Sequence, residues 1–575
     1  MKNKKFKVRV HKKPKTERIY EPAADVLDLL RIIRGHGDRI LFTYFDRSRT
    51  LHDITYSTFE KNVKALAAGL TAEGLAGKKI AVVGHTSPEW FTVYLAVLAT
   101  GGVIIPLDRE LDISQIDGFM KWVEADAIAY SDHFHEKFAD MMENHPSLRT
   151  FIPTEGDYEK CGNIIPFSSL IEEGSEAVDD GYEFPEEVDR EKLSEMLFTS
   201  GTTGTSKCVM LSQKNVFSVA TAAVETVDFY PDDVTVSVLP IHHTYELAIT
   251  LAEMIYGMHV CINDSLSHTL KNFKLFRPTA LILVPLFVNT MHKRIWAEAK
   301  KKGRDNLLKI GIIASGTAKA AGVDVRRKIF SEVLDAFGGR LEKIICGGAP
   351  LDPLMIEAFE NFGISIYEGY GITECSPLAA VTPYYARKYG SVGTAVPCCE
   401  VRIGDGGIGE SGFVEGEIQV KGDNVMLGYF DNDEANRDVF TDDGWFCTGD
   451  MGLIDKDGYI FITGRKNSVI VLENGKNVFP EEIEEYLGEI KEIAECVVVG
   501  RDANDETVEL VAIVYPNREE TPEGASDEEI RAIIEEKVTA VNKKLPTFKR
   551  IAKVELRDTE FEKTTSKKIK RHLVS

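Results

Sequence analysis

The chain has 575 residues, enough for two or more domains and a large core. Its 68 Lys and Arg residues against 91 Asp and Glu residues give a net charge of −23, which disfavours nonspecific binding to nucleic acid or to anionic membranes. Residues 1–19 depart from this balance, because nine Lys and Arg residues and one Glu give them a charge of +8.

Other features exclude further classes of protein. The best apolar stretches, Tyr94–Leu107 and Leu281–Val288, are too short to span a bilayer, and the N-terminus lacks the apolar region of a secretory signal. The nine Cys residues are scattered without C-x-x-C spacing, which argues against a disulfide framework or a zinc site. We therefore expect free thiols and a cytoplasmic location. The basic residues 1–19 are expected to be a solvated tail or, alternatively, a weak peripheral contact with the inner face of an anionic membrane.

The first predicted elements form a strand–helix–strand unit. Lys79–Gly84 reads as a buried strand, Glu89–Leu98 as a helix and Val103–Leu107 as a second strand. This spacing is typical of a βαβ unit in a parallel sheet.

The same alternation continues through the middle of the chain. Ala280–Val284 is predicted as a strand, followed by a long basic amphipathic helix that ends near Lys302. Lys309–Ile313 is predicted as a further strand that precedes another helix, and Lys343–Cys346 and Ile364–Tyr367 are predicted as strands. Such alternation indicates a large α/β body.

The pattern changes after about residue 390. Gly becomes dense, and hairpin-like turns are predicted at 404–412, 455–458 and 473–476, so this part should be a β-rich subdomain. A small α+β unit is expected from about residue 480. Its predicted elements are a helix that begins at Pro480, strands at Ala494–Val499 and Val508–Tyr515, and a helix at Asp527–Lys543.

The most informative stretch is Thr199–Leu211, which reads TSGTTGTSKCVML. Its run of small hydroxyl and Gly residues can present backbone N–H and hydroxyl donors to phosphate oxygens, and Lys207 adds a positive charge. The stretch does not match the Walker pattern, because Ser206 precedes the Lys and Cys208 follows it. From the residues alone it could be a phosphate-binding loop or a Ser/Thr-rich turn.

This stretch resembles the signature loop of the adenylate-forming superfamily, which includes acyl-CoA synthetases, aryl-CoA ligases, luciferases and peptide-synthetase adenylation domains. Further stretches resemble the other motifs of the family, in the order that the family has them. They are Leu239–Glu246, Gly347–Leu351, Tyr367–Glu374, Gly416–Tyr429, Gly444–Asp450, Gly464–Glu484 and Lys563–Arg571. The resemblance covers roughly residues 50–575, and such an ordered set is much more specific than one motif.

The resemblance implies an α/β fold with a large N-terminal body of α/β subdomains, a β-rich subdomain and a small mobile α+β C-terminal domain. We expect a basic N-terminal extension over residues 1–20 and a large AMP-binding domain over 21–466, with its β-rich subdomain at about 390–466. The mobile domain should cover 467–575.

The resemblance also implies a set of nucleotide-binding residues. Those that would hold the β- and γ-phosphates of ATP are Thr199, Ser200, Gly201, Thr202, Thr203, Gly204 and Lys207, and those of the adenine slot would be Gly347, Gly348, Ala349, Glu368, Gly369 and Tyr370. Thr373 would touch the α-phosphate, and Glu374 would bind Mg²⁺ with help from Thr199. Asp450 and Arg465 would hold the ribose hydroxyls, a task that suits an Asp. From the residues alone, Glu374 could be a surface carboxylate and Asp450 a hairpin-turn residue.

Lys568 resembles the mobile catalytic lysine of the C-terminal domain. A carboxylate that attacks the α-phosphorus meets a strongly negative environment, so cations are needed to offset the repulsion and the charge that develops on pyrophosphate. Lys207, Thr373 and Glu374 would complete the catalytic set. The alternative is a solvated basic tail, and charge alone does not distinguish Lys568 from Lys567.

A second half-reaction is implied by the family. The small domain would swing about a hinge at Asn467 and bring Gly475 toward a tunnel for the pantetheine thiol of CoA. Gly suits a position beside a tunnel, although Gly475 could equally be a turn residue. His243 would lie beside the acyl pocket, or it could be a core or turn histidine, and its neighbour His242 complicates that assignment.

Three positions depart from the family pattern. They are the Ser206–Lys207–Cys208 stretch, where Pro-Lys-Gly is usual, Lys567 in place of a Gly, and Cys398 in place of a Gly. A side chain at a Gly position restricts the backbone. Catalysis should survive, because the hydroxyl run and the charged residues of the site are all present.

The sequence resembles the long-chain acyl-CoA synthetase branch most, in residues 284–296, 424–430 and 475–484. We therefore expect a ligase that uses ATP, Mg²⁺ and CoA to activate a medium- or long-chain fatty acid, without nucleic acid as a partner. An aryl or other carboxylic acid, the pantetheine arm of an acyl carrier protein as acceptor, and a non-catalytic nucleotide- or acyl-binding protein are the alternatives.

Overall fold

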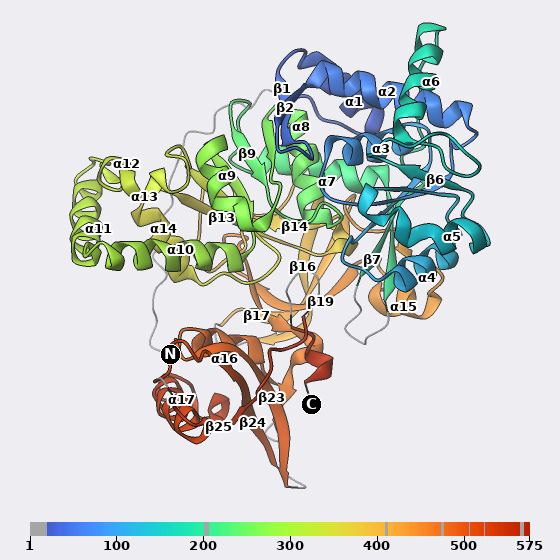
Figure 1. Cartoon of the computed structure of the whole chain (residues 1–575). Coiled ribbons are helices and arrows are strands. Elements are labelled where there is room, and N and C mark those ends of the chain that lie inside the picture. Colours follow the sequence, from blue (N-terminus) through green and yellow to red (C-terminus); the bar gives the residue numbers. More distant parts are fainter. Residues whose placement is uncertain are drawn as a thin grey trace.

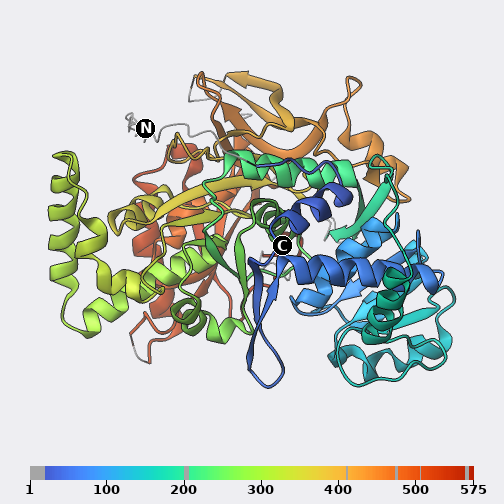
Figure 2. The same ribbon diagram turned by 90° about the horizontal axis from the view of Figure 1, so that it is seen from above.

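The computed structural model describes residues 20–199, 206–408, 412–472, 477–504, 507–522, 524–563 and 569–574. Figure 1 shows a large α/β body above a smaller unit formed by the last elements of the chain, and Figure 2 shows the same molecule from above. The predicted α/β class is confirmed. None of the described helices is long and apolar enough to cross a membrane.

The N-terminal half is built on a seven-stranded sheet with the order β18-β8-β7-β4-β3-β5-β6. The predicted βαβ unit is β3 (Lys79–Val83), α3 (Pro88–Ala99) and β4 (Val103–Leu107), with β3 and β4 parallel. Ser87 caps α3 by accepting a hydrogen bond from the N–H of Trp90, and Pro88 occupies the first turn, where a missing N–H costs nothing. The other elements of this sheet and its helices are α2 (Tyr56–Ala72), α4 (Ile113–Val123), β5 (Ala127–Tyr130), α5 (Ala139–Asn144), β6 (Thr150–Pro153), α6 (Phe167–Asp179), β7 (Leu193–Thr199), β8 (Lys207–Ser212) and β18 (Gly428–Tyr429).

Two further sheets complete the body. One has four strands in the order β2-β1-β10-β9, and the other has five in the order β11-β12-β13-β14-β15. Their elements, with the flanking helices, are α1 (Val26–Gly35), β1 (Ile40–Phe45), β2 (Leu51–Thr55), α7 (Gln213–Thr226), β9 (Val234–Ser237), α8 (Thr244–Tyr256), β10 (His259–Ile262), α9 (Thr269–Phe276), β11 (Ala280–Leu283), β12 (Lys343–Cys346), α14 (Pro353–Asn361), β13 (Ser365–Gly371), β14 (Leu378–Val381) and β15 (Thr394–Ala395). Strands β11, β12 and β13 are parallel, as the sequence predicts.

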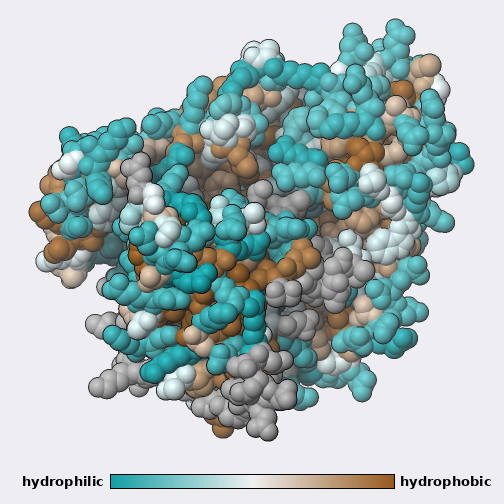
Figure 3. All heavy atoms as spheres, turned by 60° about the horizontal axis from the view of Figure 1, so that its bottom comes forward, coloured by the Kyte–Doolittle hydropathy of each residue, from teal (hydrophilic) through white to brown (hydrophobic). Residues whose placement is uncertain are grey.

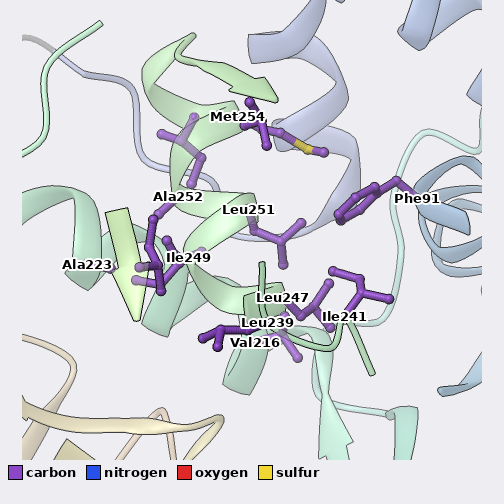
Figure 4. Close-up of a cluster of buried hydrophobic side chains, with 14 of the residues drawn as sticks. Phe91, Val216, Ala223, Leu239, Ile241, Leu247, Ile249, Leu251, Ala252 and Met254 are labelled. Carbon is purple, nitrogen blue, oxygen red and sulfur yellow. The ribbon is translucent and has the colours of Figure 1, made fainter. Parts of the chain in front are cut away.

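Helix α8 lies in the middle of the body and is buried along its whole length. Figure 4 shows Leu247, Leu251 and Met254 of α8 gathered with Phe91 of α3 and Val216 of α7. A helix that is apolar on all sides is expected to be buried. Because α8 begins directly after His242 and His243, this packing fixes one wall of the candidate site.

The prediction of a strand at Lys309–Ile313 is wrong. The segment lies inside α11 (Asp305–Ala320), which follows α10 (Pro285–Lys301) and precedes α12 (Arg326–Ile329) and α13 (Ser331–Asp335). A short apolar run cannot be assigned to strand or helix by its periodicity alone. In this helix Ile312 packs inward, whereas Ile310 and Ile313 are exposed. The run is therefore apolar on both the inner and the outer side of the helix.

The β-rich subdomain is an antiparallel sheet with the order β16-β17-β19-β20. It contains β16 (Cys399–Ile408), β17 (Val414–Gly422), β19 (Phe446–Ile454) and β20 (Ile460–Arg465), with α15 (Asp433–Val439) between β17 and β19. The predicted turn at 455–458 joins β19 to β20, with Gly458 at a φ of +83°. The predicted turn at 404–412 begins too early, because β16 continues to Ile408 with a register shift after Ile403. The turn at 473–476 lies outside the described residues.

The final unit is the predicted α+β arrangement. A three-stranded sheet with the order β23-β24-β25 carries α16 (Pro480–Gly488) and α17 (Asp527–Asn542), and short strands β21 (Ile470–Val471) and β22 (Asn477–Val478) precede it. Strands β23 (Ile493–Asn504) and β24 (Thr507–Pro516) are antiparallel, and β25 (Ile551–Leu556) runs parallel to β24. Ser526 and Glu529 form a capping box at the start of α17.

Strand β7 carries a buried carboxyl that should make stability depend on pH. Burial raises the pKa of Glu195 from 4.5 to about 8, although Tyr94 donates a hydrogen bond to it at 3.1 Å. Between these two pH values the folded protein retains a proton that the unfolded chain releases, so stability falls as pH rises. Glu195→Gln should leave the thermal midpoint unchanged near pH 4.5. At pH 8 it should raise the free energy of unfolding by at least about 1 kcal/mol.

Thermal unfolding at the two pH values tests this expectation. Glu187→Gln is the matched control, because Glu187 is exposed and its replacement should change neither midpoint. A gain from Glu195→Gln that is the same at both pH values would show that titration of this group is not the cause.

Candidate active site

The ends of the predicted phosphate loop lie side by side. Thr199 is the last residue of β7 and Lys207 the first of β8, and the two are register partners in an antiparallel pair. The Thr199 hydroxyl lies 3.5 Å from the Lys207 carbonyl oxygen, to which it donates. Ser200, Gly201, Thr202, Thr203 and Gly204, between them, lie outside the described residues. The structure therefore places the two ends of the predicted phosphate loop side by side.

Tyr429 connects this hairpin to Glu374. Strand β18 pairs Tyr429 with Val209 of β8, next to the loop. The Tyr429 hydroxyl donates to Oε1 of Glu374 at 2.8 Å, and Nζ of Lys207 lies 4.6 Å from the centre of the Tyr429 ring. A cation over an aromatic face is attracted by the ring. Lys207 and Glu374 thus contact the ring and the hydroxyl of the same tyrosine.

Glu374 is not a freely solvated surface carboxylate. It lies with Thr373 in a short 3₁₀ turn, η4 (Thr373–Cys375), directly after β13, and it is half-buried. Burial and the Glu374 carboxylate raise the pKa of Tyr429, so that this hydroxyl stays protonated and able to donate. Tyr429 was missed as a site residue from the sequence, although it stands in the Gly416–Tyr429 motif that supports the resemblance.

Asp450 forms an ion pair with one residue and accepts a hydrogen bond from another. It is the register partner of Arg465 across β19 and β20, and Nε of Arg465 lies 2.7 Å from its Oδ1. The Tyr370 hydroxyl donates to its Oδ2 at 2.8 Å. Because Asp450 is only 3% exposed and lies within a strand, the alternative of a hairpin-turn Asp is wrong.

The two halves of the predicted adenine slot are neighbours. Gly347 follows β12 directly, and Glu368 lies in β13 as the register partner of Cys346. A Cβ atom on Gly347 would lie 3.2 Å from Cζ of Tyr245 and 3.3 Å from the carbonyl oxygen of Gly369, so the backbones approach here as only a Gly comfortably allows. Gly348 has a φ of +81°, and Ala349 follows it.

Glu368 is a buried carboxyl with an unusual charge state. Burial, with a smaller contribution from Glu485 of α16, raises its pKa to about 8. It is therefore mostly protonated near neutral pH and can donate a hydrogen bond as well as accept one. Glu485 belongs to the C-terminal unit, whose helix α16 contacts β20 of the β-rich subdomain.

The rings of His242 and His243 lie 4.2 Å apart, centre to centre, and are tilted by 46° to one another just before α8. Nε2 of His242 lies 3.4 Å from Oδ2 of Asp108, whereas His243 is the N-cap residue of α8. Burial and the neighbouring His243 lower the pKa of His242 to about 3, so this ring is neutral near pH 7. Tyr245, two residues after His243, donates to the Ile345 carbonyl oxygen at 3.2 Å and links α8 to β12.

Three residues of the predicted C-terminal motifs are not described by the structure. Gly475, Lys567 and Lys568 lie outside the described residues. Asn467 is in η5 (Lys466–Ser468), directly after β20, where the domain boundary is predicted.

Cys208, one of the positions that depart from the family pattern, is a buried thiol. Its pKa is raised to about 12, so it is an inert core thiol. All nine Cys residues are free, and the described residues contain no cluster of three or more metal-binding side chains.

These contacts bring together residues from several of the sequence motifs, around Asp450 in β19 and around Glu374 after β13. The chain belongs to the AMP-binding enzyme family, the adenylate-forming superfamily, because the family model matches residues 30–430 and the model of the AMP-binding enzyme C-terminal domain matches 467–575.

Two relatives and one structure illustrate the similarity. Long-chain-fatty-acid–CoA ligase FadD15 of Mycobacterium bovis is 28% identical over 478 residues, which cover 78% of this chain and 75% of that protein. Peroxisomal long chain acyl-CoA synthetase 7 of Arabidopsis thaliana is 28% identical over 505 residues, or 83% and 70% of the two chains. The crystal structure of anthranilate CoA ligase AuaEII in complex with anthranoyl-AMP has a TM-score of 0.76 at 19% identity and covers 97% of each chain, which supports the fold.

Proposed function

We propose that this protein is an AMP-forming acid–thiol ligase that activates a medium- or long-chain fatty acid. The acid would react with ATP to give an acyl adenylate and pyrophosphate, and the thiol of CoA would then displace AMP. The observation that carries the proposal is that Tyr370 of β13 contacts Asp450, while Glu374, in the turn that follows β13, contacts Tyr429 beside Lys207. The names of the two relatives above support the fatty acid and the thiol acceptor.

The nucleotide would bind across the strand ends. Asp450 is oriented by a hydrogen bond from Tyr370 and an ion pair with Arg465, so its carboxylate is positioned before the ribose hydroxyls arrive. The Thr199–Lys207 hairpin would supply the phosphate contacts, and Gly347 and Gly369 would let the backbone lie close to the adenine.

The residues around Glu374 fit a magnesium ion. Mg²⁺ prefers a few carboxylate and hydroxyl oxygens together with the phosphates of its substrate, and Glu374 and Thr199 offer such oxygens. When bound, the ion would offset the charge of the phosphates. Tyr429 would hold one Glu374 oxygen in a fixed direction and leave the other for the ion.

In the first step, a carboxylate oxygen of the acid forms a bond to the α-phosphorus, and the bond from that phosphorus to pyrophosphate breaks. Lys207 and Lys568 would offset the charge on the phosphates during this step. In the second step, the CoA thiol loses its proton and its sulfur bonds to the acyl carbon, while AMP leaves with the shared oxygen. The domain swing at Asn467 and the approach of Gly475 remain part of the proposal.

The acyl chain would lie beside α8. A narrow space between α7, α8 and η4 is mainly apolar, and its lining residues are Glu195, Leu211, Val216, Thr244, Leu247, Ala248 and Ser376. Its carboxyl, Glu195, has a pKa of about 8 and is largely uncharged at neutral pH, which suits a hydrocarbon ligand. The space is too small for water, so the side chains would have to move apart to admit a chain. Its position next to Thr244 favours His243 as a residue at the entrance of the acyl pocket.

A substrate panel tests the proposal. AMP release should be measured with acetate, octanoate, palmitate and benzoate, each with and without CoA. We expect octanoate or palmitate to exceed acetate by at least about ten-fold in kcat/KM, because each buried CH₂ contributes about 0.8 kcal/mol. Steady-state turnover should require CoA.

The other outcomes distinguish the alternatives. A preference for benzoate would indicate an aryl-acid ligase, and an acyl adenylate that reacts with an acyl carrier protein but not with CoA would indicate a different acceptor. Thermal stabilisation by ATP without AMP release from any acid would indicate a non-catalytic binding protein.

A further inference from the structure

A helical lobe projects from the side of the large body. It comprises α10, α11 and α12, residues 285–329, and it forms the far left of the molecule in Figure 1. Residues 285–328 contain eleven Lys and Arg residues but only three Asp and Glu residues, a charge of +8 in a chain whose total is −23. This local charge is as large as that of the N-terminal 19 residues, and it belongs to a folded surface.

The outward face of α11 is aliphatic. Leu307, Ile310 and Ile313 are 63%, 61% and 70% exposed, and Val323 in the turn that follows is 57% exposed. Their spacing of three residues places the first three along one stripe of the helix. Hydrophobic residues are visible in brown at the left edge of Figure 3. A helix that faces only water would carry polar side chains at these positions.

The inner face of α11 already has its packing partners. Leu308 and Ile312 pack against the core, and Ser315 is buried. A Cβ atom on Gly311 would lie 3.2 Å from Phe330 and 3.3 Å from Ile329, so the helix sits closely on the segment after α11. The outer stripe is therefore not the side by which α11 is attached to the body.

The same helical lobe carries exposed basic side chains. They are Lys293, Arg294, Lys300, Lys301, Lys302, Lys309 and Lys328, all exposed. Within the described part of the chain, none of these seven forms an ion pair with a carboxylate. Arg304 and Arg326, by contrast, are paired with Glu332 and Asp324. The lobe thus presents an aliphatic stripe together with unpaired positive charge.

We propose that this lobe docks on an anionic lipid surface, with Leu307, Ile310 and Ile313 inserted among the acyl chains and the exposed lysines of the lobe at the headgroups. Aliphatic residues on one face of a helix with Lys and Arg beside them are the pattern of helices that lie in a membrane interface. The proposal goes beyond the ligase reaction and does not depend on which acid is activated. Membrane binding would then depend on the local charge of the lobe and not on the net charge of the whole chain.

Charge favours a lipid surface over other occupants of the stripe. A second copy would bring another lobe of +8 against the first, and the basic residues 1–19 would repel the lobe in the same way. An acidic protein partner would need both carboxylates and a groove shaped for three projecting side chains. A fluid lipid surface supplies negative charge and apolar volume without a preformed groove.

Vesicle co-sedimentation of the full chain tests the proposal. The probes are vesicles of phosphatidylcholine alone and of phosphatidylcholine mixed with phosphatidylglycerol. The wild type should bind the anionic vesicles more strongly, and added salt should weaken the binding. The triple variant Leu307→Gln/Ile310→Gln/Ile313→Gln should lower the partition coefficient at least about ten-fold, and Lys300→Gln/Lys301→Gln/Lys302→Gln should remove most of the preference for anionic lipid.

Two controls isolate the lobe. Ile408→Gln/Val414→Gln changes two residues that are 81% and 50% exposed at the β16–β17 hairpin, and it should bind as the wild type does. Deletion of residues 2–18 should leave most of the binding in place. All variants should share the thermal midpoint and circular dichroism of the wild type. Absence of wild-type binding, equal binding by the α11 variant, or loss of binding on deletion of residues 2–18 alone would each overturn the proposal.

Discussion

Glu374→Gln should reduce ATP–pyrophosphate exchange by about 10²–10³-fold, mainly through kcat. The change keeps the size of the side chain but removes the negative charge that would hold Mg²⁺. Because Tyr429 donates to Oε1 of Glu374, the neutral amide can still accept this hydrogen bond in one of its two orientations. The loss would therefore report the missing charge, and a higher Mg²⁺ concentration should restore part of the rate.

Tyr429→Phe separates positioning from metal binding. It keeps the ring on which Nζ of Lys207 rests but removes the hydroxyl that reaches Glu374. Exchange should fall by about ten-fold, because one hydrogen bond to a charged group contributes about 1.5–3 kcal/mol, of which only part is specific to the transition state. The apparent affinity for Mg²⁺ should fall as well.

Glu342→Gln is a suitable control for both changes, since Glu342 is exposed and lies at the opposite, N-terminal side of β12. It should exchange pyrophosphate at the wild-type rate. If Glu374→Gln stays within a few-fold of the wild type at limiting Mg²⁺, then Glu374 does not hold the ion.

Much of the fold could be predicted because local and tertiary requirements agree. The run Lys79–Gly84 is apolar enough for a strand buried on both faces, and β3 occupies Lys79–Val83. Pro480 and Ser526 start helices at positions where Pro and Ser are favoured. At Lys309–Ile313 the prediction failed, because the outer face of α11 is apolar where a surface helix is normally polar. The helical alternation of apolar and polar residues is therefore missing from this segment.

The site could be predicted as a set of motifs, but not as contacts. The order of the motifs was enough to nominate Asp450, Arg465 and Glu374. That Asp450 and Arg465 are register partners depends on how β19 pairs with β20, including a register shift after Met451. Tyr429 reaches Glu374 because β18 pairs with β8, a strand more than 200 residues earlier in the chain. The residues around Tyr429 alone do not predict that pairing.

Asp450→Asn should raise the KM for ATP by about 10–100-fold with a smaller change in kcat. One oxygen of Asp450 forms an ion pair with Nε of Arg465, and the other accepts a hydrogen bond from the Tyr370 hydroxyl. Asn has one oxygen and one amide group, so one of these donors would face another donor. A buried hydrogen bond to a charged group contributes about 1.5–3 kcal/mol, which corresponds to this range of affinity.

A nucleotide without ribose hydroxyls distinguishes ribose binding from a structural role. With 2′,3′-dideoxy-ATP, the wild type should lose affinity and Asp450→Asn should change little further, because the hydroxyls that Asp450 would bind are absent. Asp443→Asn is the matched control. Asp443 pairs with Arg402 at 2.6 Å in the same subdomain but is exposed, so its loss should change the KM for ATP less than about two-fold. If Asp450→Asn weakens ATP and its dideoxy analogue by the same factor, then the carboxylate only supports the sheet, and the ribose is held by other residues.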